Sequence, residues 1–301
     1  MIDEELGGSM IKLLCSDFDN TLARRGRVPR INVEEIPKLR ANGIEFAIVT
    51  GRVASNIISK AEKYKIDAHI VGTNGSIVLE KGDHLLFEHP IDRSIIGDIV
   101  QECHDNGWYY FIFDRDDVYI PEEKFGIVTK TPLAHIASFF AKTKVFGTNH
   151  RLEQFDAYGA KAHKINIYPK KQEVMDVREE YLKNEELYVT WSNNNKLEIM
   201  AADVNKWNGI LHLAEKLGIE KHEIATIGDY NNDIPMIVNS EMGFAVGNAH
   251  EEIKEIADHV VRNVEDGAVA EAIDFIINHN SKLKTTDTVD NNEDRQWNEY
   301  Q

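Results

Sequence analysis

Short apolar runs alternate with helical patterns along the first part of the chain. The run at 11–16 predicts a buried strand, because it is apolar and bounded by polar residues. Similar runs at 44–49 and 70–72 predict two further strands, and helical patterns end near residue 43 and span 54–64. Strand, helix, strand, helix, strand is the order of a doubly wound α/β fold, a Rossmann-like core with a parallel sheet.

The first helix has conflicting signals at its start. Asn32, followed by Glu35 three residues later, resembles a capped helix start. Pro37 sits awkwardly in that register, because proline lacks the N–H that the interior of a helix uses. The pattern therefore predicts a helix that begins a few residues after Asn32.

The pattern changes character between residues 82 and 195. Strand-like runs outnumber helical crossovers there, and two of them flank a polar turn, which is a hairpin signature. This stretch predicts an α+β domain inserted into the first one as a cap, with 122–162 assigned only loosely. The expected strands are 85–91, 109–113, 118–120, 165–168 and 187–191, with helices at 94–105 and up to about 183.

The parallel pattern resumes at about residue 196. The expected elements are strands at 197–200, 224–227, 244–246 and 260–261, and helices at 205–217, from 251, and at 268–277. The catalytic core is therefore predicted to comprise 11–81 and 196–280, and the cap 82–195. Residues 1–10 are expected to be a leader. A cloning remnant in front of a native start at Met10 would explain these residues. The tail 281–301 is predicted to be disordered, because it has almost no apolar periodicity.

Composition narrows the class of protein. The chain has 301 residues, 42% of them hydrophobic, and a formal net charge of -17. That balance argues against a nucleic-acid or membrane surface, because such surfaces need clustered Lys and Arg. No membrane helix or signal peptide is evident, and Cys15 and Cys103 fall in a predicted strand and helix, which does not favour a disulfide. We therefore expect a cytoplasmic protein. The negative net charge does not exclude an anionic substrate, since a local cation can reverse the field inside a cleft.

Polar side chains follow several of the predicted core strands. In a single doubly wound sheet these strand ends open onto one edge, so the residues should converge. Carboxylate oxygens favour Mg²⁺, whereas Zn²⁺ prefers Cys and His, and the twelve histidines show no zinc-binding spacing. The converging residues are Asp17 and Asp19, Thr50, Asn74 and Gly75, and Asp229, Asn232 and Asp233.

Each of these signatures also has a plain structural explanation. Asp17 and Asp19 could end a strand in a turn, and Thr50 could begin an ordinary strand-to-helix turn. Lys206 could be a solvated helix lysine, and Asp229 could cap a helix. Every one of these signatures lies at a strand end or at a helix start. If each had only its plain structural explanation, four coincidences would be needed. Phosphoryl transfer explains them jointly, because Mg²⁺, a carboxylate, a hydroxyl and a lysine stabilise its transition state.

The chain resembles the haloacid dehalogenase-like (HAD) hydrolase superfamily over about 11–278. It is most similar to the Cof-type sugar-phosphatase branch, which has a large α/β (C2B-type) cap. Asp17-Phe18-Asp19-Asn20-Thr21-Leu22 matches the first motif and Thr50-Gly51-Arg52 the second. Lys206 matches the third motif, and Gly228-Asp229-Tyr230-Asn231-Asn232-Asp233 the fourth. Asn20 departs from the usual glycine, but asparagine tolerates a positive φ, so the loop is expected to form.

The resemblance implies a role for each motif residue. Asp17 would be the nucleophile that forms an aspartyl-phosphate, and Asp19 would protonate the leaving oxygen and then activate water. Thr50 and Lys206 would bind the phosphoryl oxygens. Mg²⁺ would be held by Asp17, the Asp19 carbonyl and Asp229, with Asn232 or Asp233 nearby. The residues implied to bind substrate are Arg52, Asn74, Gly75, Asn232 and Asn248.

We therefore predict a Mg²⁺-dependent phosphatase for small phosphorylated metabolites such as sugar phosphates, acting as a monomer or homodimer. A phosphomutase with the same nucleophile is one alternative. A catalytically idle binding or regulatory homologue is another, although an idle protein would not need Asp17. The cap is expected to choose the leaving group. Its aromatic residues are expected to pack more often than to line a substrate site, namely Trp108, Tyr109, Tyr110 and Trp191.

Overall fold

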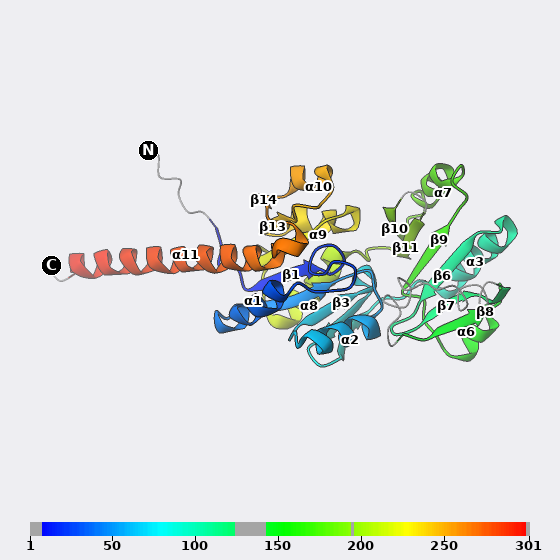
Figure 1. The fold of residues 1–301 in the computed structure, drawn as a ribbon, viewed down its shortest axis with the longest axis horizontal. Helices are drawn as coiled ribbons and strands as arrows, with labels where there is room; N and C mark the ends of the chain where they lie inside the picture. The colour runs from blue at the N-terminus through cyan, green and yellow to red at the C-terminus, as the bar shows by residue number, and fades with distance from the viewer. Residues whose placement is uncertain (1–7, 124–142, 194–195, 299–301) are drawn as a thin grey trace.

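The chain forms two β-sheets, which belong to two parts of the molecule (Figure 1). The structure is a computed structural model that describes residues 8–123, 143–193 and 196–298, with side chains for 8–123, 143–191 and 196–285. An eight-stranded sheet forms the core, and a six-stranded sheet forms the cap. The α/β class and the inserted α+β cap predicted from the sequence are confirmed.

The core sheet is parallel except at one edge. Its order is β14-β13-β12-β1-β2-β3-β4-β5, and only β4 and β5 are antiparallel to their neighbours. The chain leaves β1 through β2 and β3 on one side and returns through β12, β13 and β14 on the other. The strand order thus reverses between β1 and β12, which is where open α/β sheets bind ligands. The strands are β1 (Leu13–Asp17), β2 (Glu45–Val49), β3 (His69–Gly72), β4 (Ile77–Glu80), β5 (His84–Glu88), β12 (Ile224–Gly228), β13 (Met242–Ala245) and β14 (His259–Val260).

Apolar strands and amphipathic helices enclose the core. Every residue of β1 is buried, as expected for a central parallel strand covered on both faces. The helix starting at Ala54 was predicted with its observed bounds, and α8 begins where Asn205 caps it by accepting a hydrogen bond from the backbone N–H of Asn208. The helices are α1 (Arg30–Ala41), α2 (Ala54–Tyr64), α8 (Lys206–Leu217), α9 (Ile234–Asn239), α10 (Glu251–Ile256) and α11 (Ala268–Asn298), with short 3₁₀ turns η1 (Thr73–Gly75), η2 (Lys221–Glu223), η3 (Asn231–Asp233) and η4 (Val264–Asp266).

The cap sheet is mainly antiparallel. Its order is β10-β11-β9-β6-β7-β8, and only β7 and β8 are parallel to each other. The predicted hairpin is confirmed as β6 and β7, while β8 and α6 lie in the stretch that the sequence left loosely assigned. The elements are β6 (Tyr109–Phe113), β7 (Val118–Pro121), β8 (Val145–Thr148), β9 (Lys164–Tyr168), β10 (Leu187–Asn193) and β11 (Lys196–Ala201), with α3 (Arg93–Asn106), α6 (Glu153–Ala157) and α7 (Val174–Tyr181).

The division between core and cap differs from the expected boundaries at 82 and 196. Strand β5, assigned to the cap, pairs with β4 in the core sheet. Strand β11, assigned to the core, pairs with β9 and β10 in the cap sheet. Both strands lie next to a link between the two parts, where an apolar run alone does not tell which sheet a strand will join.

The start of α1 also differs from the prediction. The helix begins at Arg30 and runs through Pro37. Asn32 is buried inside it and does not cap it; its Oδ1 accepts a hydrogen bond from the backbone N–H of Ala270, at the start of α11 (3.0 Å). The asparagine therefore joins two helices, and the local capping pattern was misleading because its side chain serves a distant helix.

The predicted disordered tail is helical as far as Asn298. Helix α11 extends well beyond the body of the molecule in Figure 1. Its first turns are buried, with Ile273 and Ile276 in the core cluster. A helix nucleated by packing gains one backbone hydrogen bond for each added residue, so it can continue through a polar sequence that has no apolar face.

Two other expectations concern side chains. Cys15 and Cys103 are both buried and reduced, as predicted. Trp108 and Tyr110 are buried in the cap core, so these two aromatic residues pack rather than line a ligand site.

Within the part of the chain described, no helix has the length and hydropathy needed to cross a bilayer.

Gly75 allows the first turn of α8 to approach the loop after β3. Its φ is +105°, and a Cβ at this position would lie 2.1 Å from the carbonyl oxygen of Asn205. Gly209, one turn into α8, faces Gly75 in the same contact. Both glycines are required by the close approach of backbone to backbone. This contact fixes the end of α8 that carries Lys206.

We expect Gly75→Ala to lower the free energy of unfolding by about 2–4 kcal/mol, because the new Cβ both clashes and strains the backbone. Gly218→Ala, at the other end of α8, is the matched control: it has a positive φ of 67° but open space around it, so strain alone should cost about 1 kcal/mol. Urea denaturation of both variants measures the difference. Equal losses would show that the close approach does not matter.

Candidate active site

Three neighbouring strands bring the motif residues to one edge of the core sheet. Asp17 is the last residue of β1, whose residues pair in register with β2 and β12. Thr50 follows β2 directly, and Asp229 follows β12 directly. The loop after Asp17 turns back on itself through Asn20, which has the positive φ (61°) predicted for it. The predicted convergence at the switch point of the sheet is therefore observed.

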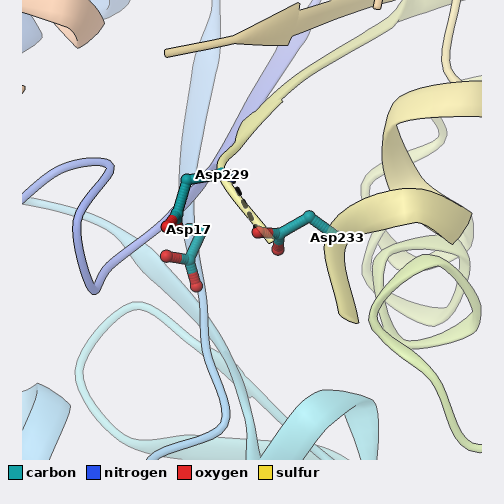
Figure 2. Close-up of side chains that lie close together, drawn as sticks. All are labelled: Asp17, Asp229 and Asp233. Atoms are coloured by element: carbon teal, nitrogen blue, oxygen red, sulfur yellow. Dashed lines mark hydrogen bonds between the residues drawn. The ribbon is translucent and has the colours of Figure 1, made fainter. Parts of the chain in front are cut away.

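Three buried carboxylates form a cluster at this edge. Oxygens of Asp17, Asp229 and Asp233 lie within 4.8 Å of one another, and Figure 2 shows them approaching from β1, from the end of β12 and from the turn before α9. Their exposed fractions are 5%, 6% and 0%. Carboxylates packed this closely repel unless a cation relieves them.

Lys206 supplies one such cation. It is the first residue of α8 and 1% exposed, and its Nζ donates to Asp17 Oδ1 (2.5 Å) and Asp233 Oδ1 (2.6 Å). Burial alone would lower the pKa of Lys206, but the two carboxylates outweigh it and the pKa is raised. The lysine is therefore held charged between its partners. It does not line the cavity described below.

Asp233 and Thr21 hold the loop of the fourth motif. Asp233 Oδ2 accepts hydrogen bonds from the backbone N–H groups of Asp229 (2.9 Å; dashed in Figure 2) and Tyr230 (3.0 Å). Both Asp233 oxygens thus already accept hydrogen bonds. Thr21 donates from Oγ1 to Asp229 Oδ1 (3.0 Å). Asp17 and Asp229 are left as the members of the cluster that also line the open cavity.

The cluster has more negative charge than Lys206 can balance. Burial raises the pKa of Asp17 well above its usual range, and Asp233 and Asp229 raise it further against the opposing effect of Lys206. Burial, together with Asp233, raises the pKa of Asp229 to about 7. Three carboxylates of which one lysine neutralises one leave a site that a divalent cation with oxygen ligands fits.

Asp19 lies apart from this cluster, because Arg52 holds its side chain. Arg52 Nε and Nη2 donate to the two Asp19 oxygens, each at 2.6 Å. Arg52 is itself buried, and its Nη1 donates to Asn56 Oδ1 (2.8 Å) while its guanidinium lies 5.2 Å from the Phe18 ring centroid. The Asp19 carboxylate is therefore fixed beside the cavity and not among the clustered carboxylates. A role for Asp19 as a metal ligand rests on its backbone carbonyl alone.

Thr50 is placed as predicted. It is buried and lines the cavity, and its Oγ1 accepts a hydrogen bond from the backbone N–H of Arg52 (3.2 Å). Its hydroxyl hydrogen remains available for an oxygen in the cavity. The turn that places it is held by a further bond, from the Asn74 backbone N–H to the Thr50 carbonyl (2.9 Å).

The five residues expected to bind substrate divide into two groups. Arg52, Asn232 and Asn248 line the cavity, whereas Asn74 and Gly75 do not. Asn74 is buried beneath it, where its Nδ2 donates to Glu198 and its Oδ1 accepts from Asn232 (3.3 Å). Substrate binding by Asn74 and Gly75 is thus not supported, because packing and hydrogen bonds within the protein already occupy both.

Asn248 holds the first-motif loop. Its Nδ2 donates to the Asn20 carbonyl (2.9 Å), and its Oδ1 accepts from the backbone N–H of Val264 (2.8 Å). Both ends of its amide are therefore used within the protein, although the residue borders the cavity. Its position supports a role in fixing the loop that carries Asp19.

A cavity of about 480 Å³ opens over these residues, and the cap forms part of its wall. The sequence reasoning missed the residues that the cap contributes: Lys164, Asn166, Lys196 and Glu198. Two others from the core were also missed: Arg24 and His250. Polar side chains alternate with buried apolar ones along β9 and β11, but solvent-facing strands show the same alternation, so the sequence alone did not single these cap residues out.

Comparison with known proteins gives one family. A family model described as haloacid dehalogenase-like hydrolase matches residues 14–273. Phosphatase YwpJ of Bacillus subtilis (strain 168) is 23% identical over 295 residues, which cover 89% of this chain and 100% of that protein. The 5-amino-6-(5-phospho-D-ribitylamino)uracil phosphatase YcsE of the same organism is 28% identical over 268 residues, 87% of this chain and 94% of that one.

A solved structure has the same fold. The structure of a haloacid dehalogenase-like hydrolase from B. subtilis superposes with a TM-score of 0.78. It covers 88% of this chain and 99% of that chain, at 23% sequence identity. The likeness therefore includes the cap as well as the core.

The raised pKa of Asp229 makes stability depend on pH. Its pKa rises from 3.8 to about 7 on folding, so in the absence of metal the charged carboxylate destabilises the fold increasingly as pH rises from about 4 to about 7. We expect Asp229→Asn to be more stable than the wild type at pH 8 by up to about 4 kcal/mol, with the difference vanishing near pH 4. Urea denaturation with chelator at both pH values measures it, with exposed Asp98→Asn as control. A difference independent of pH would contradict the assignment.

Proposed function

Because the chain belongs to the haloacid dehalogenase-like hydrolase family, we propose that it is a Mg²⁺-dependent phosphatase of small phosphorylated metabolites, with Asp17 as nucleophile. The observation that carries the proposal is the buried Asp17 carboxylate, bonded to Lys206, adjacent to Asp229 and open to the cavity. The relatives named as phosphatases support the reaction class. The polar cavity wall supports a small, hydrophilic substrate.

Asp17 and Asp229 are the side chains that would hold Mg²⁺, with Asp233 beside them. Their oxygen-only donor set and uncompensated negative charge suit this ion. A bound Mg²⁺ would neutralise charge on the transferring phosphoryl group.

Asp17 begins the reaction by attacking phosphorus. Its carboxylate oxygen forms a bond to phosphorus as the ester P–O bond breaks, and the Asp17-linked phosphoryl group results. Lys206 keeps Asp17 oriented through the bond to Oδ1. Thr50 Oγ1 is placed to donate its hydrogen to a phosphoryl oxygen. The alcohol oxygen that leaves must gain a proton, which Asp19 is positioned to donate from the cavity wall.

Asp19 then reverses its role. Having given its proton to the alcohol, its carboxylate takes a proton from a water molecule that attacks the phosphoryl group on Asp17. The Asp17–phosphorus bond breaks, inorganic phosphate forms, and the Asp17 carboxylate is restored. Arg52 holds Asp19 beside the cavity, and its two bonds favour the ionised carboxylate that takes the proton from water in this second half.

We expect purified protein with Mg²⁺ to release phosphate from members of a broad phosphomonoester panel. Asp17→Asn should abolish release, by at least about 10³-fold, because the amide cannot act as the nucleophile. Exposed Asp98→Asn is the matched control, and chelation should stop turnover until Mg²⁺ is restored. No phosphate release from any substrate, or full activity in Asp17→Asn, would contradict the proposal. Interconversion of sugar phosphate isomers without phosphate release would indicate a phosphomutase.

The Arg52–Asp19 pair predicts a dependence on the leaving group. Arg52→Ala should lower kcat/KM about 10²-fold or more for an alkyl phosphate, whose leaving oxygen needs a proton from Asp19. The loss should be less than about tenfold for p-nitrophenyl phosphate, which leaves without one. Steady-state kinetics on both substrates measure the contrast, and Arg40→Ala on the exposed face of α1 is the control. Equal losses on both substrates would mean that Arg52 binds the phosphoryl group instead.

A further inference from the structure

The cap holds the loop of the second motif by its backbone. This second-motif loop, residues 50–55, runs from the end of β2 into the first turn of α2 and carries Thr50 and Arg52. Lys164, at the start of β9 in the cap, is 2% exposed, and its Nζ donates to the carbonyl oxygen of Gly51 (2.5 Å). A hydrogen bond from a charged donor is stronger than one between neutral groups. The cap therefore binds the backbone between the two site residues directly.

The hairpin of β6 and β7 holds the other end of the same loop. The backbone N–H of Ala54 donates to the carbonyl oxygen of Arg115 (2.9 Å), and Ser55 Oγ donates to that of Asp116 (2.8 Å). The first N–H groups of a helix have no partner within the helix, so the cap supplies an acceptor that α2 lacks. Val53, buried between these ends, packs against apolar side chains of the cap, namely Phe113, Val118 and Ile120.

A ring of hydrogen bonds joins the start of the loop to two strands of the cap. Asn74 donates its backbone N–H to the carbonyl oxygen of Thr50 (2.9 Å) and its Nδ2 to Glu198 Oε2 (2.7 Å). Lys164 also donates to Glu198 Oε2 (3.3 Å). A Cβ on Gly51 would lie 2.9 Å from Asn74 Oδ1 and 3.2 Å from Lys164 Nζ, so glycine allows the close approach. The loop is thus fixed to β9 and β11 together.

A buried ammonium group is a costly way to join two parts of a protein. Burial lowers the pKa of Lys164 to about 8, against the opposing effect of Glu198. An apolar side chain at such a position can pack without this cost, so a buried ion pair is weak evidence for a role in stability. The bond to the Gly51 carbonyl offers a different explanation, because it sets the position of the backbone that presents the Thr50 hydroxyl.

We propose, on the basis of the proposed phosphatase function, that Lys164 and Ser55 are positioning residues for phosphoryl transfer: through the second-motif loop they hold Thr50 and Arg52 in place. A misplacement of about 1 Å at a site can cost about 10²-fold in rate. The role is separate from recognition of the leaving group. It should act on every phosphomonoester, including one whose alcohol makes no contact with the cap.

The first test uses p-nitrophenyl phosphate, whose leaving group needs no proton, so that the placement of Thr50 is measured. Lys164→Met should lower kcat/KM about 10–100-fold. In a Thr50→Val background the same change should cost less than about threefold, because the hydroxyl that it positions is already absent. Lys170→Met, at an exposed position of the cap, is the control and should keep wild-type activity. Wild-type activity in Lys164→Met, or losses that multiply in the double variant, would overturn the proposal.

A second variant removes a contact without removing a buried charge. Ser55→Ala should lower kcat/KM for the same substrate about 3–10-fold, since one of several contacts with the loop is lost. Ser59→Ala makes the same change one turn later in α2, where the described residues show no hydrogen bond to the cap, and should keep wild-type activity. Thermal unfolding checks that each variant folds, and the serine pair decides if Lys164→Met does not. Equal losses in the two serine variants, or none in Ser55→Ala, would overturn the proposal.

A binding measurement does not depend on turnover. Calorimetry with inorganic phosphate and Mg²⁺ should show binding that weakens at least about tenfold in Lys164→Met but less than about threefold when this change is added to Thr50→Val. Such coupled binding in a wild type that releases no phosphate from any substrate would overturn the phosphatase proposal and keep the positioning role. Phosphate release with turnover and phosphate binding indifferent to Lys164 would overturn the positioning role and keep the phosphatase.

Discussion

The site depends on one buried ammonium group. Lys206 lies between Asp17 and Asp233, and each partner connects it to a different part of the fold: β1 on one side, and the turn before α9 on the other. Removing one member of a buried ionic group leaves the others uncompensated, which typically costs 3–5 kcal/mol. Such a cluster is therefore a constraint on geometry. Strand β1, helix α8 and the fourth-motif loop can pack together only in the arrangement that satisfies all three side chains.

That constraint explains why small features far from the chemistry matter. Gly75 and Gly209 let α8 approach the loop after β3, and this approach places the first residue of α8 under the sheet edge. Asn248 anchors the loop after β1 to the first residue of η4. Neither contact touches the carboxylate cluster. Both set the positions of the backbone segments from which the catalytic candidates project, and so they define the distances within the site.

The local sequence pattern was sufficient to predict the site residues at the strand ends. Asp17, Thr50 and Asp229 each follow an apolar run directly, so topology alone brings them together, and the family resemblance that these motifs carried is confirmed. The polar face of the cap could not be read in the same way. Lys196 lay at the start of the segment expected to belong to the core, just before the predicted strand, and Asn166 meets Glu198 only through an antiparallel register between distant segments. In a single sequence, buried polar positions on a strand have the same alternation as solvent-facing ones.

The predictions for the tail and for the start of the first helix were wrong for a related reason. Asn32 has the local pattern of a cap but bonds to Ala270, and the polar sequence after residue 280 continues a helix whose stability comes from its packed beginning. In both cases a contact distant in sequence decides the outcome. Short-range propensity describes what a segment prefers when isolated, and here the neighbouring elements outweigh it.

The alternation in β9 and β11 has a consequence for how this protein can diverge. The apolar residues of these strands maintain the fold of the cap, whereas the polar residues between them face the ligand cavity. A mutation at a polar position outside the buried ion pairs of Glu198 with Lys164 and Lys196, such as Asn166, therefore changes the wall of the cavity while the packing of the cap and the distant carboxylates stay as they are. Selection could retune such a wall one residue at a time, at little risk to folding or to the reaction itself. The same arrangement would allow descendants of one ancestral chain to acquire different substrates while their cores remain nearly identical.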